Sequence, residues 1–181
     1  MSCLVNDCLE KGLDIECGGA RYNWVMPSFV GLANLVDSIA VIEKLVFEDR
    51  KYTILSVKKM LDCNFDGFEV QRNELLNRVP KYGNDIDWVD RWCSIITEHI
   101  VNECKKYTFN FTNGRWIPSV FCWIMHTQLG EETGATPDGG LAGFPLGDGS
   151  GPAQGREQKG PTASIISSTK WSHKESVKLW R

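Results

Sequence analysis

A glycine-rich stretch in the last third of the sequence constrains the fold of this chain more than any other feature. Ten of the 17 glycines lie between Gly130 and Gly160, hereafter the glycine-rich segment. Neither a helix nor a strand tolerates this density, because glycine destabilises the interior of both elements. The stretch also contains Asp138, Phe144 and Gln154, which break the repeats typical of a flexible linker or tail. We therefore predict an irregular loop with a defined shape, stiffened by its prolines. These prolines are Pro137, Pro145 and Pro152, with Pro161 directly after.

The overall composition is that of an ordinary globular protein. The chain has 181 residues, enough for one core, and 42% of them are hydrophobic and 24% charged. The net charge of −3 and the scattered Lys and Arg residues argue against nucleic acid or an anionic membrane as a partner. The sequence has no apolar run of membrane-spanning length and no basic N-terminal region followed by an apolar core. We therefore expect a cytoplasmic protein.

Seven cysteines are present, and no two of them form a CxxC pair. An odd number of cysteines in a cytoplasmic chain predicts reduced thiols, most of them small buried apolar side chains. Cys17 precedes two glycines, whose backbone N–H groups could lower the pKa of its thiol, so a nucleophilic role is an alternative. The absence of a nearby His or Lys in the sequence favours the structural interpretation.

Apolar periodicity predicts helices in the first half of the chain. The pattern of three and four residues between apolar positions predicts a helix over Val30–Phe47, buried on more than one side. Thr53 is a good N-cap for a helix through Leu61, and a further helix is expected from Phe68 to Asn77. In the first of these helices the inward positions are expected at Leu32, Leu35, Val36, Ile39, Ile42 and Val46, with Ala33, Ala40 and Val41 beside them.

A fourth helix is predicted from an N-cap at Asn84 or Asp85 to about Cys104. It carries Trp88 and Trp92 at a spacing of four residues, which is more typical of core packing than of a cofactor site. His99 and Glu103 have a spacing that allows two metal ligands on one helix. They lack a third candidate ligand, so we interpret both residues as structural.

The period then changes to that of strands. Aromatic and polar residues alternate over 107–112, and an apolar run follows over Ile117–Met125, which predicts two strands. His126 would then follow a strand end, a common place for site residues in barrel enzymes, although a structural role is favoured without a partner. A last helix is expected from Pro161 or Thr162, since Pro is preferred in the first helical turn.

Three blocks of this sequence resemble glycyl radical enzymes of the pyruvate formate-lyase type. The first is CLEKGLDIECGGARYNW with GLANLVDSIAVIEKLVFED at 8–49, and the second is YGNDIDWVD at 82–90. The third is TPDG, AG, DG, PAQGR and KGPTA within 136–164. The resemblance extends over nearly the whole chain and is specific for the superfamily rather than for one substrate. Gly140 and Phe144 depart from it, because the family usually has Arg at the first of these positions and commonly an acidic or small polar residue at the second.

The resemblance implies a radical mechanism, in which an activating enzyme makes a glycyl radical that passes to a cysteine and then to the substrate. Neither the glycine loop nor the thiyl cysteine of that relay has a counterpart in this sequence. The chain therefore resembles an internal fragment between the two loops, and we predict no catalytic, no cofactor-binding and no metal-binding residues in it. The implied fold is α/β: a mostly helical fragment with a few strands, taken from a ten-stranded α/β barrel that this chain leaves incomplete.

The implied partners belong to the full-length family: a radical S-adenosylmethionine activating enzyme, a small-molecule substrate and a second copy in a homodimer. By domain, we expect a partial pyruvate formate-lyase-like domain over 1–173 and a divergent C-terminal tail over 174–181. A noncatalytic interaction module that reuses this segment is the alternative. Since the glycine-rich segment has little apolar surface, we expect neighbouring elements to hold it, and we expect those elements to lie outside this chain.

Overall fold

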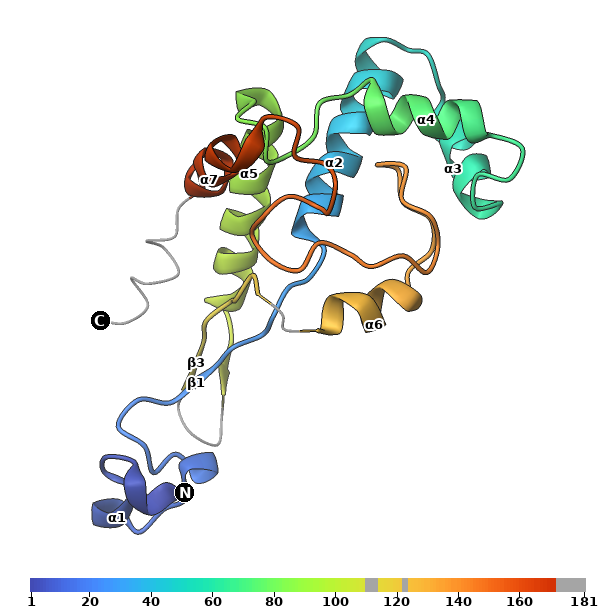
Figure 1. The fold of residues 1–181 in the computed structure, drawn as a ribbon. Helices are drawn as coiled ribbons and strands as arrows, with labels where there is room; N and C mark the ends of the chain where they lie inside the picture. The colour runs from blue at the N-terminus through green and yellow to red at the C-terminus, as the bar shows by residue number, and fades with distance from the viewer. Residues whose placement is uncertain (110–113, 122–123, 172–181) are drawn as a thin grey trace. The chain divides into compact units, whose positions relative to one another are not determined.

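The computed structural model describes residues 1–109, 114–121 and 124–171, so the predicted tail at 174–181 lies outside the described residues. Helices dominate, and the few strands are short, which confirms the predicted fold class (Figure 1). In chain order, the elements are η1 (Ser2–Leu4), α1 (Cys8–Lys11), η2 (Ile15–Cys17), β1 (Trp24–Val25), α2 (Leu32–Ile42), η3 (Glu43–Glu48), α3 (Ile54–Asp62), α4 (Glu69–Asn77), α5 (Asp87–Cys104), β2 (Thr108–Phe109), β3 (Gly114–Trp116), α6 (Met125–Glu131) and α7 (Gly160–Thr169).

The chain divides into two compact units. The described part of the first unit consists of residues 1–28, 97–109 and 114–119, and that of the second consists of residues 29–96, 120–121 and 124–171. The first unit holds a three-stranded sheet of order β1-β3-β2, in which β1 is parallel and β2 antiparallel to β3. The parallel ladder extends past β1, where the Ser119 N–H donates to the Pro27 carbonyl over 2.9 Å.

The core of the second unit is built on α2 and its π-helical continuation η3. These two elements together form the helix predicted over Val30–Phe47. Val36 and Ala40 are fully buried, as is Leu45 in η3, and the burial of Ala33 and Val41 confirms that more than one side is covered. Leu35 was predicted to face inward, but its side chain is 47% exposed.

The two helices after η3 begin where the sequence predicts them. Thr53 caps α3, because its hydroxyl accepts from the Ser56 N–H over 3.1 Å and the Ser56 hydroxyl accepts from the Thr53 N–H over 2.9 Å. This reciprocal pair is a capping box, which satisfies two backbone N–H groups that lack partners within the helix. The next helix, α4, ends at Asn77, ahead of Pro80.

The predicted strand over Ile117–Met125 is wrong in its extent. Regular pairing in β3 ends at Trp116, and beyond it Ser119 and Phe121 form only isolated bridges. Pro118 has no N–H to donate to a ladder, which explains why the regular strand does not continue. Residues 122–123 lie outside the described part, and a helix, α6, begins at Met125.

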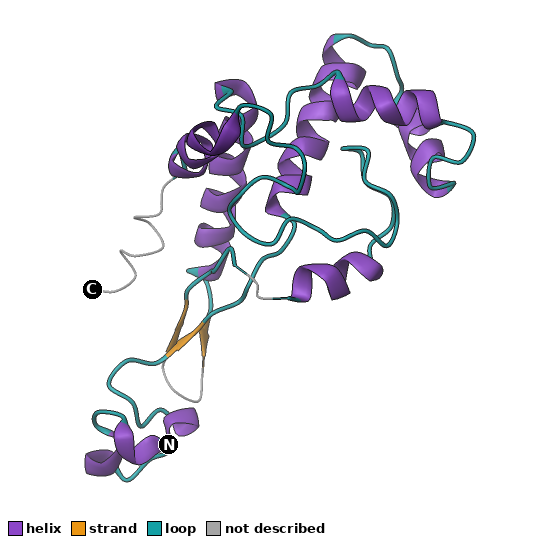
Figure 2. Cartoon of the chain, in the orientation of Figure 1, coloured by secondary structure: helices purple, strands orange, loops and turns teal. Residues whose placement is uncertain are grey.

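The glycine-rich segment connects α6 to α7 and contains no helix or strand over 132–159, as the sequence predicts (Figure 2). α7 then begins at Gly160 and carries Pro161 in its first turn. This position suits proline, because the missing N–H would have no partner within the helix. The segment belongs to the second unit, together with α2, α3, α4 and the first half of α5.

Candidate functional site

The glycine-rich segment is held by side chains from the first half of the chain, and this arrangement is the candidate site. Asn34 of α2 makes the first connection, since its amide oxygen accepts from the Gly147 N–H over 2.7 Å. Its amide nitrogen donates to the carboxylate of Asp138 over 3.1 Å. The backbone reinforces this contact, because the Gly31 N–H donates to the Gly147 carbonyl over 3.0 Å. One side chain of α2 thus fixes two points of the segment.

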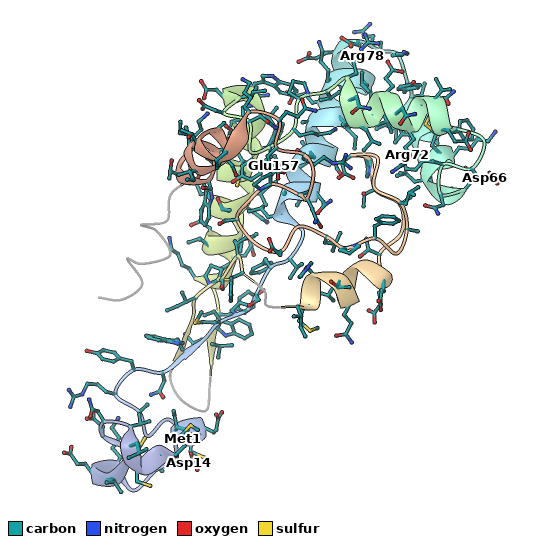
Figure 3. All side chains as sticks on the ribbon, viewed as in Figure 1. Met1, Asp14, Asp66, Arg72, Arg78 and Glu157 are labelled. Atoms are coloured by element: carbon teal, nitrogen blue, oxygen red, sulfur yellow. The ribbon has the colours of Figure 1, made fainter. Side chains whose placement is uncertain are left out.

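The region of α3 and α4 makes the second connection. The guanidinium of Arg72 extends from α4 toward the loop and donates through Nε to the Gly139 carbonyl over 2.9 Å (Figure 3). Asn64, after α3, accepts from the Ala142 N–H over 2.8 Å. Gly139 has φ +94°, and a Cβ at this position would lie 2.7 Å from the Leu76 side chain. Glycine is required here by both the backbone conformation and the space.

Asn84 makes the third connection with four hydrogen bonds. Its amide nitrogen donates to the carbonyls of Lys81 (3.0 Å) and Arg156 (2.9 Å). Its amide oxygen accepts from the N–H groups of Gln158 (2.7 Å) and Lys159 (3.1 Å). The side chain is only 5% exposed, and these bonds use its full capacity of two donors and two acceptor sites.

The prediction that Asn84 or Asp85 caps α5 is therefore wrong. The helix begins at Asp87, so neither residue occupies the N-cap position. The Asp85 carboxylate instead pairs with Lys170 over 2.6 Å, at the C-terminal end of α7. The backbone N–H just before the helix is satisfied by Asp90, which lies in the first turn of α5. Its carboxylate accepts from the Ile86 N–H over 3.1 Å.

Asp90 also fixes α7 to α5. Its carboxylate accepts from the Ser167 hydroxyl over 2.9 Å and from the Lys170 ammonium over 2.9 Å. Ser167 in turn accepts from the Asp85 N–H over 2.8 Å. The three carboxylates of Asp85, Asp87 and Asp90 raise the pKa of Lys170, although its burial opposes them. The end of the glycine-rich segment is thus tied to the core through α7.

Asp37 of α2, Lys81 and Asp138 are buried charged residues, and the half-buried Arg156 interacts with them electrostatically. Burial raises the pKa of Asp37 to about 7, against the opposing charge of Lys81 and the hydrogen bond from the Tyr82 N–H. Burial lowers the pKa of Lys81 to about 8, although the charges of both aspartates oppose the shift. The charges of Lys81 and Arg156 favour ionised Asp37, whereas the charge of Asp138 opposes it, so Lys81 is the main electrostatic partner of Asp37 in this group.

Asp138 shapes the segment from within. One carboxylate oxygen accepts from the Gly140 N–H over 3.2 Å and from the Thr136 hydroxyl, and the other accepts from Asn34. A Cβ at Gly140 would collide with the Thr136 hydroxyl oxygen.

The structure separates the candidate residues that the sequence suggested. Cys17 is exposed at the end of η2, and His99 is exposed on α5, where Glu103 pairs with Lys106 over 2.6 Å. His126 lies in the first turn of α6, not at a strand end, and its Nδ1 is buried with no hydrogen-bond partner among the described residues. None of these residues joins another in a nucleophile–base pair in the described part of the chain.

The tryptophan pair belongs to the core, as the sequence predicts. Trp88 and Trp92 both pack against the buried cluster of the second unit. The indole N–H of Trp92 donates to the Glu43 carboxylate over 2.7 Å, so its one polar group is satisfied. The described residues also contain no group of three His, Cys, Asp or Glu side chains placed to hold a metal ion. Within these same residues, every helix is too short or too polar to cross a membrane.

Comparison with known proteins assigns this chain to a protein family. The family model described as pyruvate formate lyase-like matches residues 1–130. This chain belongs to the pyruvate formate lyase-like family. Among curated relatives, it is 37% identical to trans-4-hydroxy-L-proline dehydratase of Clostridioides difficile over 173 residues, 96% of this chain and 22% of that protein.

Solved structures agree with this assignment. The B12-independent glycerol dehydratase from Clostridium butyricum is 38% identical with a TM-score of 0.89, over 97% of this chain and 22% of that one. A glycyl radical enzyme from Archaeoglobus fulgidus is 34% identical with a TM-score of 0.88, over 96% of this chain and 22% of that one. This member of the glycyl radical enzyme family thus spans about a fifth of the length of the proteins that it matches.

The residues that hold the glycine-rich segment were missed by sequence reasoning. We expected its support from elements outside this chain, and the structure corrects this: Asn34, Asn64, Arg72 and Asn84 all lie within the chain. An asparagine at a loop or helix position gives no signal of a partner more than 70 residues away in the sequence. The dense glycines were the signal that such partners had to exist, because a loop without apolar surface needs polar contacts to keep one shape.

Proposed function

We propose that this chain is the part of a glycyl radical enzyme between its cysteine loop and its glycyl radical loop, and that it performs no radical chemistry alone. In this proposal, residues 1–173 form the family segment and residues 174–181 a divergent tail. The observation that carries the proposal is the glycine-rich segment held by Asn34 and Asn84, in a chain with a TM-score of 0.89 to a glycerol dehydratase.

The whole enzyme would act on a small molecule through bond cleavage that starts with hydrogen abstraction. Relatives are named as dehydratases, as an isethionate sulfite-lyase and as an indoleacetate decarboxylase, and a formate acetyltransferase-type reaction is a further option in the family. The radical would be introduced by a radical S-adenosylmethionine activating enzyme in an oxygen-free cytoplasm, and the enzyme would act as a homodimer. The task of this chain is to fix closely packed backbone next to the reacting groups, which positions them and excludes water.

A noncatalytic interaction module is the second candidate, and one observation favours it. The anchors of the glycine-rich segment lie within this chain, so the segment has partners without the rest of an enzyme. In that case the chain would serve by binding another protein, and its likeness to the enzymes would reflect only the reuse of a stable shape.

A chimera separates the two candidates. The matching segment of trans-4-hydroxy-L-proline dehydratase is replaced by residues 29–171 of this chain, and the chimera is activated without oxygen by that enzyme's own activating enzyme. We expect a glycyl radical signal in electron paramagnetic resonance and measurable dehydration, because the segment supplies scaffold only. A control chimera with Asn84→Ala should lose most of both. A folded chimera with neither radical nor dehydration would support the interaction module instead.

A further inference from the structure

A cavity of about 180 Å³ lies where the α4–α5 connection meets the end of the glycine-rich segment, within the second unit. Its walls come from two stretches, 76–86 and 156–159. Among the described residues that line it, four are cationic and none is a carboxylate. These four are Arg78, Lys81, Arg156 and Lys159, and we call the space the basic cavity.

The four cations differ in how far their charge is already neutralised. Arg78 is committed elsewhere, because its guanidinium pairs with Glu74 over 2.6 Å and with Asp49 over 3.5 Å. Lys81 is buried, and among the described residues its ammonium donates one hydrogen bond, to the Leu75 carbonyl over 2.7 Å. An ammonium has three donors, so Lys81 has capacity for further acceptors.

Arg156 and Lys159, like Lys81, form no salt bridge among the described residues, although the charge of Arg156 also acts on Asp37. The Nε–H of Arg156 is buried, and it has no hydrogen-bond partner within the described ranges. Among the same residues, neither the Arg156 guanidinium nor the exposed Lys159 ammonium forms a salt bridge. A buried donor without a partner is unfavourable and is normally satisfied by protein, water or ligand. The amide oxygen of Asn84 accepts from the backbone N–H groups of Gln158 and Lys159, so these two donors of the lining are already satisfied.

We propose that the basic cavity binds a small oxyanion, a phosphate or a carboxylate, through Arg156, Lys159 and Lys81. The guanidinium of arginine presents its donors in a planar fork that matches two oxygens of such a group. The two flanking lysines supply charge without a fixed direction. A cavity of this size holds a small molecule rather than a polymer, and the net charge of −3 gives the chain no general affinity for polyanions. The site does not depend on the proposed radical function, because its residues lie in this chain alone.

The test is titration of the 181-residue chain with inorganic phosphate and, separately, with acetate, at constant ionic strength maintained with sodium chloride. Binding is followed by the thermal midpoint and by broadening of the phosphorus-31 resonance of phosphate. We expect saturable binding of at least one of the two anions. Arg156→Gln should weaken it at least tenfold, and Lys159→Gln, an exposed substitution that leaves the fold intact, severalfold.

Lys58→Gln is the matched control, since this lysine is 65% exposed and pairs only with Asp62 on α3 among the described residues. The Lys58→Gln protein should bind the anion with the same affinity as the wild type. If the chain binds only phosphate, the ligand is a phosphate, and if it binds only acetate, the ligand is a carboxylate. The proposal is overturned if neither anion has an effect beyond chloride, or if Lys58→Gln weakens binding as much as Lys159→Gln does.

Discussion

Removal of the Asn84 amide is the sharpest perturbation of the glycine-rich segment. This side chain is 5% exposed and makes four hydrogen bonds, of which three reach backbone groups at 156, 158 and 159. A net contribution of about 0.5–1.5 kcal/mol per bond gives about 2–6 kcal/mol for the four. Water can replace the amide at the exposed residues Gln158 and Lys159, so we expect Asn84→Ala to cost about 2–4 kcal/mol.

The assay is urea unfolding at 25 °C, with Asn73→Ala as the matched control. Asn73 is exposed on α4, and its replacement removes no side-chain hydrogen bond among the described residues. Trypsin provides a second reading, because local loosening exposes the bonds after Arg156 and Lys159 to cleavage. We expect faster cleavage at both sites in Asn84→Ala. The reasoning is refuted if Asn84→Ala and Asn73→Ala differ by less than about 0.5 kcal/mol and are cleaved at equal rates.

Three further predictions follow from the buried charges, from a close backbone contact and from the missing radical relay. The pKa of Asp37 is about 7 in the folded chain and about 4 unfolded, so the native state binds more protons between these values and stability falls as the pH rises through this window. The stability of the wild type relative to Asp37→Asn should therefore fall by about 2–3 kcal/mol from pH 5 to pH 8 in urea unfolding, and a constant difference would contradict this. Gly83→Ala should destabilise by about 2 kcal/mol or more, because its φ is +89° and the new Cβ would lie 2.5 Å from Pro152. Gly134→Ala, in open space, should be nearly neutral in the same assay, and equal effects would disprove the steric argument. Finally, anaerobic incubation of the chain with an activating enzyme and S-adenosylmethionine should give no glycyl doublet in electron paramagnetic resonance, and such a doublet would refute the absence of a relay.

The sequence predicts local structure well where the signal is local. The stripe of α2, the Thr53 cap and the Pro161 start of α7 each depend on residues within one or two turns. The prediction over Ile117–Met125 fails because the apolar pattern outweighed Pro118, which has no N–H to donate, so beyond Trp116 only isolated bridges form. The two-residue strand β1 gives no pattern at all, since its pairing with β3 joins residues about 90 apart in the chain.

The site was predictable in kind but not in detail. Glycine density predicts a shaped loop, yet Asn84 resembled a helix cap because its chemistry is the same in both roles. Asp37 lies within an apolar stripe and gave no sign of its burial. The burial of Asp37 depends on tertiary contacts with the Tyr82 N–H and with the charge of Lys81. Both residues are more than 40 positions away in the sequence, so the residues next to Asp37 do not reveal these contacts.

Amide hydrogen exchange tests the central claim most directly, namely that residues of this chain hold the glycine-rich segment in one shape. The N–H groups of Ala142, Gly147 and Gln158 each donate to an asparagine side chain, whereas those of Gly151 and Gly155 have no partner among the described residues. We expect exchange at the first three positions to be at least about tenfold slower than at the two glycines, after correction for intrinsic rates. Equal exchange at all five positions would contradict the claim and would mean that the segment needs partners from outside the chain.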